Sequence, residues 1–194
     1  MHKYIEQNED LIEHFAPLEV KHLLNELNCS IIISEIKKDE HILIEGSSCD
    51  TLTYIIKGSF RQYTEAKGAE INFLFYFEND FVLDYLSFLK ATPSKYSILA
   101  IENSVVLQIN RTDLDSLKEK NVLWNIFLKN VAEKSIIRLY KRNEVLLTLT
   151  PEERYLKLLE VHPQIIQRVS LRKIATFIGV TEQSLSRIRK RIVS

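Results

Sequence analysis

The sequence is poor in the residues that cross-link or turn a chain. Its 194 residues include only two cysteines, four prolines and four glycines. Cys29 and Cys49 cannot form a disulfide framework and make no CxxC pair, so we expect a reduced, cytoplasmic protein. No apolar run approaches the ~18–20 residues that span a bilayer. The polar start, "MHKYIEQNED", lacks the apolar core of a signal peptide. We therefore expect no membrane partner.

The motifs of common enzyme classes are also missing. With four glycines in all, backbone loops that cradle phosphate are scarce. There is no GxSxG elbow and no suggestive Cys/His nucleophile pair. A cupin-like metal site needs several histidines facing into one barrel, and His41 stands alone on its predicted strand. We expect a protein that is not an enzyme, with no catalytic residues, metal ligands or cofactor.

Charge is balanced overall but unevenly distributed. The chain has 26 Lys/Arg and 26 Asp/Glu, yet from Thr150 onward nine Lys/Arg face four Asp/Glu. Such asymmetry indicates contact with nucleic acid or, equally on charge alone, a solvated basic face.

The hydrophobic pattern predicts an α+β chain in three parts. Residues 1–28 have helical spacing, and from Ser30 the period changes to short β-branched and aromatic runs separated by turn signals. These runs predict an antiparallel β-roll of jelly-roll (double-stranded β-helix) type, interrupted at "DYLSFLK" (84–90) by one or two helical turns. We expect an effector domain over 1–118, a long dimerisation helix over 119–147 and a helix-turn-helix domain over 148–194.

The first half of the long helix is apolar on nearly all sides, and a roll can cover only one of them. A second copy of the helix would cover another side, so we expect a homodimer. The alternative is a helix packed wholly within its own chain. The predicted dimer seam consists of Trp124, Leu128, Ala132, Ser135 and Leu139.

Residues 170–193 have the form of a helix-turn-helix. Ser170 is expected to cap the first helix, Gly179 to end it, and Thr181 to cap the second. Leu185, Ile188 and Ile192 would be buried. The outer face of the second helix then carries residues that match base edges in the major groove. We expect base readout by Gln183, Ser186 and Arg187.

Cations and small polar residues flank this predicted face and suit phosphate contact, which fixes the register of a protein on DNA without reading sequence. We expect DNA-backbone contacts from Arg168, Ser170, Arg172, Lys173, Thr181, Arg189 and Lys190, with Arg191 beside them.

In its order of elements and local motifs the chain resembles the CRP/FNR family of transcription regulators. The likeness rests on Glu45–Gly46, "IIKGSFR" (55–61), "ENDFVLDYLSFL" (78–89) and "VTEQSLSRIRK" (180–190). The resemblance implies a homodimer that reads a two-fold-related site on double-stranded DNA, with RNA polymerase as a further partner. FNR-type members carry E-x-x-S-R in the recognition helix. Here Gln183 replaces the acid, whereas Ser186 and Arg187 are retained.

The effector side departs from the family pattern, and the effector is unknown. Cyclic-nucleotide-binding members carry Gly-Glu-Leu after "DF" and an Arg-Ser pair further on; this chain has Leu83-Asp84-Tyr85 and Ser94-Lys95. A side chain at 83 crowds the phosphate, and lysine lacks the bidentate fork of arginine. We expect cyclic AMP to bind weakly or not at all. The effector candidates are Asp84, Tyr85, Ser94 and Lys95.

Two alternatives remain: a protein-interaction module that uses the long helix, and a β-roll ligand sensor without sequence-specific DNA binding. Because the chain ends just after the second helix, we also expect the β-hairpin wing of many relatives to be missing or reduced.

Overall fold

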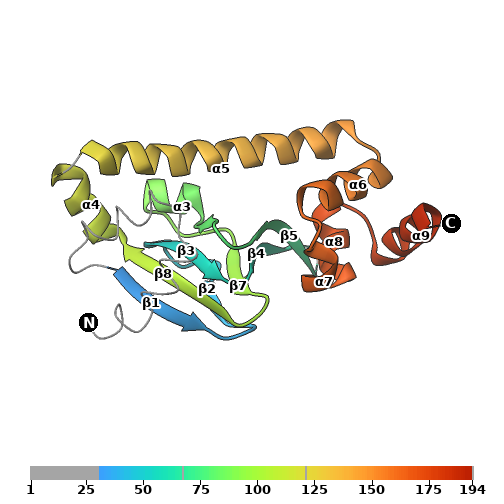
Figure 1. Cartoon of the computed structure of the whole chain (residues 1–194), viewed down its shortest axis with the longest axis horizontal. Coiled ribbons are helices and arrows are strands. Elements are labelled where there is room, and N and C mark those ends of the chain that lie inside the picture. The colour runs from blue at the N-terminus through green and yellow to red at the C-terminus, as the bar shows by residue number, and fades with distance from the viewer. Residues whose placement is uncertain (1–30, 67, 121, 194) are drawn as a thin grey trace.

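Two antiparallel sheets form the roll. The computed structural model describes residues 31–66, 68–120 and 122–193, so the predicted helix over 1–28 and Cys29 lie outside the described residues. The first sheet has the order β1-β8-β3-β6 and the second the order β2-β7-β4-β5. The antiparallel roll is confirmed (Figure 1). The strands are β1 (Ile31–Ile36), β2 (His41–Leu43), β3 (Thr51–Lys57), β4 (Phe60–Ala66), β5 (Ala69–Tyr76), β6 (Phe81–Val82), β7 (Ser97–Ala100) and β8 (Ser104–Asn110).

The core lies between the sheets, where alternate side chains meet. Ile55, Phe60 and Val106 are fully buried in it. The sequence pattern missed β6, because a two-residue strand has no periodicity to detect. It pairs with β3 through Thr53 and Tyr54.

Gly58 makes the tight turn between β3 and β4. Its φ is +105°, and a Cβ at this position would lie 2.7 Å from the Ser104 Cα and 2.1 Å from its Oγ. Both the backbone angle and the contact exclude a side chain, so only glycine fits here.

Helix α3 (Tyr85–Lys90) closes one side of the roll and confirms the predicted helical turns. Asp84 caps it by accepting hydrogen bonds from the Leu86 and Ser87 N–H groups at 3.2 and 3.5 Å. Phe88 packs into the core of the roll, so this helix covers the hydrophobic interior.

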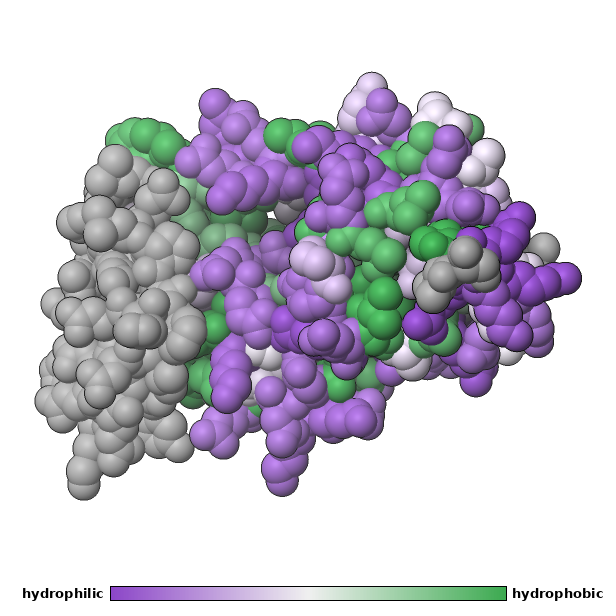
Figure 2. Space-filling view, turned by 45° about the vertical axis from the view of Figure 1, so that its right-hand side comes forward, coloured by the Kyte–Doolittle hydropathy of each residue, from purple (hydrophilic) through white to green (hydrophobic). Residues whose placement is uncertain are grey.

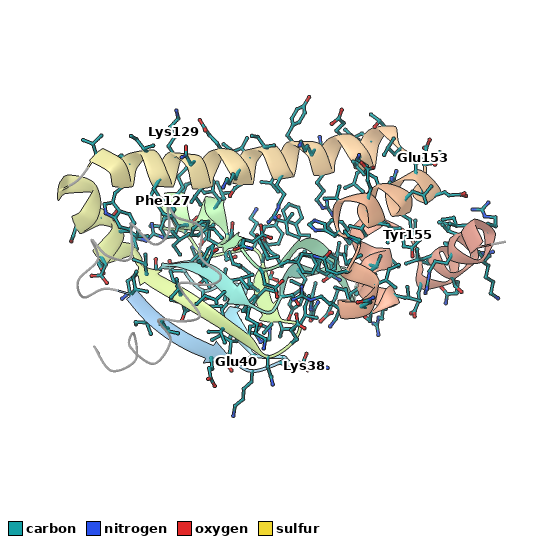
Figure 3. The ribbon with its side chains drawn as sticks, in the orientation of Figure 1. Lys38, Glu40, Phe127, Lys129, Glu153 and Tyr155 are labelled. Atoms are coloured by element: carbon teal, nitrogen blue, oxygen red, sulfur yellow. The ribbon has the colours of Figure 1, made fainter. Side chains whose placement is uncertain are left out.

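Two helices follow the roll, α4 (Arg111–Lys120) and the long α5 (Val122–Thr148). Helix α5 runs along the whole molecule, from the roll to the C-terminal helices (Figure 1). In Figure 3, Phe127 points toward the roll and Lys129 points away from it. This orientation defines which face of α5 is covered by its own chain.

The predicted dimer seam needs correction at its first two positions. Trp124 is only 1% exposed and belongs to the core of the roll, and Leu128 packs against the same core. Burial within its own chain is complete for Trp124 and partial for Leu128, and it stabilises both without a second copy. Ser135 is half-buried, and its hydroxyl donates to the Val131 carbonyl. Among the side chains of α5 that the structure describes, the exposed large apolar ones are Val122, Ile126, Ile136, Ile137, Leu139, Tyr140 and Leu147.

Four short helices complete the chain at the far end of α5 (Figure 1). In the first of them, Thr150 and Glu153 form a capping box and Pro151 lies in the first turn. None of the described helices has the length and apolar character needed to cross a bilayer. The four are α6 (Pro151–Val161), α7 (Ile165–Arg168), α8 (Leu171–Ile178) and α9 (Glu182–Val193).

A second apolar core joins these helices to the roll. It combines Phe75, Phe77 and Ile101 from the roll with buried side chains of α6 to α9. Tyr155, which points into this end of the molecule in Figure 3, is 2% exposed. The four C-terminal helices, called the head below, are therefore docked on the roll as well as on α5.

Candidate nucleic-acid interface

Helices α8 and α9 pack through one apolar face each. In α8 the buried residues are Ile174, Ala175 and Ile178, and in α9 they are Leu185 and Ile188. The small Ala175 is 1% exposed within the apolar core that α8 and α9 share. Gly179 ends α8 in the left-handed region with a φ of +76°, as the sequence predicted. The two helices therefore meet at a fixed turn.

The caps of this pair agree only partly with the sequence prediction. Thr181 accepts a hydrogen bond from the Ser184 N–H at 3.2 Å and so caps α9. Ser170 occupies the N-cap position of α8, but its side chain makes no capping hydrogen bond. Ile192, in the last turn of α9, is 37% exposed rather than buried as predicted.

The opposite face of α9 points to solvent. Gln183, Ser186, Arg187 and Lys190 are all exposed. They lie at helical spacing on one side of the helix, away from the buried Leu185 and Ile188. Hydrophilic residues cover most of this end of the molecule (Figure 2). An exposed face of amide, hydroxyl and guanidinium groups is able to hydrogen-bond to base edges.

The flanking cations lie in different surroundings. Arg172 is exposed, whereas Lys173 and Arg189 are half-buried. Burial, followed by the nearby Arg61, lowers the pKa of Lys173. Arg191 forms an exposed ion pair with Glu152, with 3.0 Å between Nη2 and Oε2. Exposed pairs of this kind are weak, so Arg191 remains able to exchange its partner for a phosphate.

Arg168 requires a correction, because two carboxylates of the roll bind its guanidinium. Its Nη1 and Nη2 each donate to Glu78 at 2.8 Å, and Nε donates to Glu102 at 2.9 Å. A further hydrogen bond joins Nη2 to Glu102. The guanidinium carbon lies 5.0 Å from the centre of the Phe77 ring. Arg168 therefore fastens the head to the roll in this structure rather than facing a duplex.

The groups around Arg168 are themselves held in place. Glu78 accepts the Gly58 N–H at 2.8 Å, and Glu102 accepts the Ser59 hydroxyl at 2.7 Å. Burial alone would raise the pKa of Glu78. The hydrogen bonds from Arg168 and from backbone N–H groups outweigh burial and hold that pKa below its usual value. Glu78, Glu102 and Arg168 are called the carboxylate latch below.

A second contact holds α8 against strand β5. The Asn72 amide donates to the Thr176 hydroxyl at 2.8 Å and to the Lys173 carbonyl at 3.3 Å. The rings of Phe75 and Phe177 lie 5.1 Å apart. Because Asn72 is only 1% exposed, its amide cannot bond to water, and the two hydrogen bonds to α8 supply the partners that it needs. They involve the side of α8 that faces the roll and leave the outer face of α9 uncovered.

The predicted effector residues separate into two groups. Asp84 and Ser94 come together in the roll, with the Ser94 hydroxyl donating to Asp84 at 2.7 Å. Both are buried, and Asp84 also caps α3, so their polar groups already have partners. Tyr85 packs against the core, and Lys95 is exposed. Leu83 is 6% exposed and occupies core space beside this pair.

Sequence analysis missed two arginines on the inner face of α5. Arg138 pairs with Asp80 at 2.7 Å, and Arg142 reaches the carbonyls of Asn72 and Phe177. The sequence could have indicated them, because Arg138 and Arg142 are four residues apart and lie on the same helical face as Trp124, which packs against the roll. Within the described ranges, no three His, Cys, Asp or Glu side chains are grouped as a metal site requires.

Comparison with known proteins defines the class of the roll. Residues 33–121 match the family model of the cyclic nucleotide-binding domain. No curated protein matches the chain. The roll thus carries the cyclic nucleotide-binding domain fold.

Solved structures extend the comparison to most of the chain. FixK2 from Bradyrhizobium japonicum is 18% identical, with 84% of each chain covered and a TM-score of 0.74. The c-di-GMP-responsive global regulator CLP from Xanthomonas campestris is 15% identical, with 90% of each chain covered and a TM-score of 0.70. A CRP-family transcriptional regulator from Thermus thermophilus is 18% identical, covers 82% of this chain and 83% of its own, and has a TM-score of 0.65. Roll, long helix and head together have the fold of CRP-type regulators.

Proposed function

We propose that the protein is a DNA-binding transcription regulator of CRP/FNR type. The single observation that carries the proposal is the exposed face of α9, where Gln183, Ser186 and Arg187 lie opposite the buried Leu185 and Ile188. An α-helix with such a face fits the major groove of B-DNA, and its side chains match base edges.

The side-chain chemistry indicates which residues contact bases and which contact phosphates. Arg187 is suited to a bidentate contact with guanine, and Gln183 to adenine. Arg189 and Lys190 belong to α9 itself, and we propose that they contact phosphate together with Ser170, Arg172, Lys173 and Thr181. Arg168 is left out of this set, because the carboxylate latch neutralises its charge.

Selection of bound sequences from random double-stranded DNA tests the proposal. The enriched sequences should contain two related half-sites, with centres about one helical turn apart. The double variant Gln183→Ala/Arg187→Ala should lose the enrichment, whereas a matched double variant on the roll surface, Lys37→Ala/Lys38→Ala, should retain it. Enrichment of no motif by the wild-type protein would contradict the proposal.

A homodimer formed through α5 is part of the same proposal. Beyond Trp124 the exposed side of α5 has a heptad pattern, with alternate spacings of three and four. Ile136 is 56% exposed and Leu139 is 36% exposed, and Asn143 is exposed in the same row. A lone asparagine at such a seam favours a parallel, in-register pair. The proposed seam is Lys129, Ala132, Ile136, Leu139 and Asn143.

Sedimentation velocity on two adjacent substitutions tests this seam. Ile136→Glu places a carboxylate in the seam and should shift the protein to monomer. Ile137→Glu is one residue along, off the seam and 52% exposed, and should leave the dimer intact. Equal effects of the two substitutions would refute the seam, and a monomeric wild-type protein would refute the dimer.

Cyclic AMP is not the ligand that we propose for the roll. The Asp84–Ser94 pair is bonded internally, and the Leu83 side chain lies beside it where cyclic-nucleotide-binding relatives carry glycine. We further propose that RNA polymerase is a partner of the DNA-bound protein, as the resemblance to CRP/FNR regulators implies.

A further inference from the structure

A short turn, Phe77–Asp80, joins the roll to both the head and α5. The Asp80 N–H donates to the Phe77 carbonyl at 3.1 Å, and the Phe77 N–H donates to Asp80 Oδ2 at 3.0 Å, so the turn is closed on itself. Glu78 binds Arg168 of the head at 2.8 Å. Asp80 binds Arg138 of α5 at 2.7 Å. This segment is called the junction turn below.

His162, the residue that caps the C-terminal end of α6, lies against the junction turn. The centres of the His162 and Phe77 rings are 5.1 Å apart, and their planes are tilted by 39°. Phe77 is only 4% exposed and belongs to the apolar core that joins the roll to the head. His162 itself is half-buried. The imidazole is therefore part of the surface by which the head docks on the roll.

Charged groups of α5, the roll and the head surround this imidazole. The charge of Arg138 from α5 opposes a proton on the ring, and the charge of Asp80 from the roll favours one. On the head, the guanidinium carbon of Arg168 lies 5.0 Å from the centre of the same Phe77 ring. Among the residues that the structure describes, no carboxylate forms an ion pair with the His162 imidazole. A protonated His162 would thus add a third cation at the junction turn without a carboxylate of its own.

A proton on His162 is unfavourable while the head is docked. Burial, followed by the charge of Arg138, lowers the pKa of His162, and Asp80 opposes only part of this effect. An imidazole in water has a pKa of about 6.5. On α6 itself, Lys157 and Glu160 are exposed and pair with each other at 2.8 Å, so solvent screens their effect on the ring. A head released from the roll would therefore bind a proton more readily than the docked head.

We propose that His162 is a pH-sensitive switch for docking of the head: the neutral imidazole permits docking on the roll, and the protonated imidazole weakens it. Docking is complete above about pH 6.5 and weakens as the pH falls through the lower pKa of the docked ring. Glu78 keeps its charge over this range, because its pKa lies below the usual glutamate value. The switch therefore acts at a higher pH than the carboxylate latch. Docking is independent of the proposed function, whereas any effect of pH on DNA affinity rests on it.

Hydrogen exchange measured by mass spectrometry on the full-length protein tests the switch. The wild-type protein is compared with His162→Phe at equal pH, from about pH 5 to about pH 8, so that the chemical exchange rate cancels. Phenylalanine keeps a ring against Phe77 but cannot be protonated. Peptides from β5 and α8 report on docking, because Asn72 and Thr176 bond these two elements across the interface. Their exchange rate in the wild-type protein, relative to His162→Phe, should rise several-fold between about pH 7.5 and about pH 5.5.

His41→Gln is the matched control. His41 is exposed on β2, and its Nε2 lies 3.0 Å from the Tyr63 hydroxyl within the roll. Its substitution removes a histidine that does not touch the head, so the pH dependence of the wild-type protein should persist.

An NMR titration of the His162 ring in the wild-type protein gives a second measurement, which holds even if His162→Phe does not fold. The ring should titrate below the usual histidine pKa of about 6.5. A ring that titrates at or above this value would overturn the proposal. So would an exchange ratio that does not change with pH, or loss of the pH dependence in His41→Gln. No DNA is present in these measurements, so their failure is distinct from failure of the selection experiment.

Discussion

Replacing Arg168 by glutamine should loosen the head from the roll. Solvent-exposed ion pairs contribute up to about 1 kcal/mol, and a hydrogen bond to a charged group contributes about 1.5–3 kcal/mol. The side chains of Arg168, Glu78 and Glu102 are 19%, 34% and 39% exposed, which places the carboxylate latch between these cases. We expect Arg168→Gln to lower the free energy of unfolding by about 2 kcal/mol. The melting temperature should fall by about 4–8 °C in a chain of this size.

Thermal and urea denaturation measure this effect, with Arg172→Gln as a matched control. Arg172 is exposed at the start of the neighbouring helix α8, so its loss should change stability by less than about 0.5 kcal/mol. A double-mutant cycle of Arg168→Gln with Glu78→Gln should give a coupling energy of about 1 kcal/mol. Equal effects of the two arginine substitutions, with no coupling to Glu78, would refute the latch.

The latch also has a pH signature. The pKa of Glu78 lies below its usual value, so its contribution is present above the pKa of an unfolded glutamate and is lost as the pH falls through the folded pKa. The stability difference between wild type and Arg168→Gln should therefore narrow below about pH 4. Because two carboxylates neutralise Arg168, the same variant should leave the salt dependence of DNA binding unchanged.

Four further predictions concern the head, the roll and its turns. Arg187→Ala should weaken the free energy of binding to the selected site by about 1–3 kcal/mol and relax the sequence preference. Lys190→Ala should weaken binding to all sequences evenly and reduce the slope of log affinity against log salt by about one. Equal effects of both variants on selected and random DNA would contradict these roles. Calorimetry should detect no micromolar binding of cyclic AMP. Asp84→Asn should lower the free energy of unfolding by about 1–2 kcal/mol, because the cap of α3 and the hydrogen bond from Ser94 both weaken. Gly58→Ala should destabilise the fold by about 3 kcal/mol or more, and Gly46→Ala by about 1 kcal/mol. Both glycines have a positive φ, but only a Cβ at Gly58 would collide with Ser104. Similar melting temperatures of the two variants would contradict this difference.

Helix caps and strands were predictable, because each depends on residues that are neighbours in the sequence. Gly179 ends one helix and Thr181 begins the next at the predicted positions, because capping depends on a few consecutive residues. The β-roll was predicted from the period-two runs and their turns.

The dimer seam shows where sequence patterns fail. Helical spacing groups residues into faces but does not identify which face meets the roll. Trp124 and Leu128 have the spacing of a seam, and the core of the roll covers them in its own chain. Ile136 and Leu139 lie on the side that remains exposed. Only the path of α5 across the roll distinguishes these faces.

The sequence by itself determined the order of the elements, their caps and the basic, polar character of α9, because periodicity and side-chain chemistry are local properties. Only the tertiary structure decided the partners of the arginines. Arg168 is separated from Glu78 by 90 residues and from Glu102 by 66, and Arg142 meets rings from the roll and from α8. Whether a cation contacts a carboxylate, an aromatic ring or solvent depends on how distant segments are brought together, and sequence spacing carries no measure of that distance.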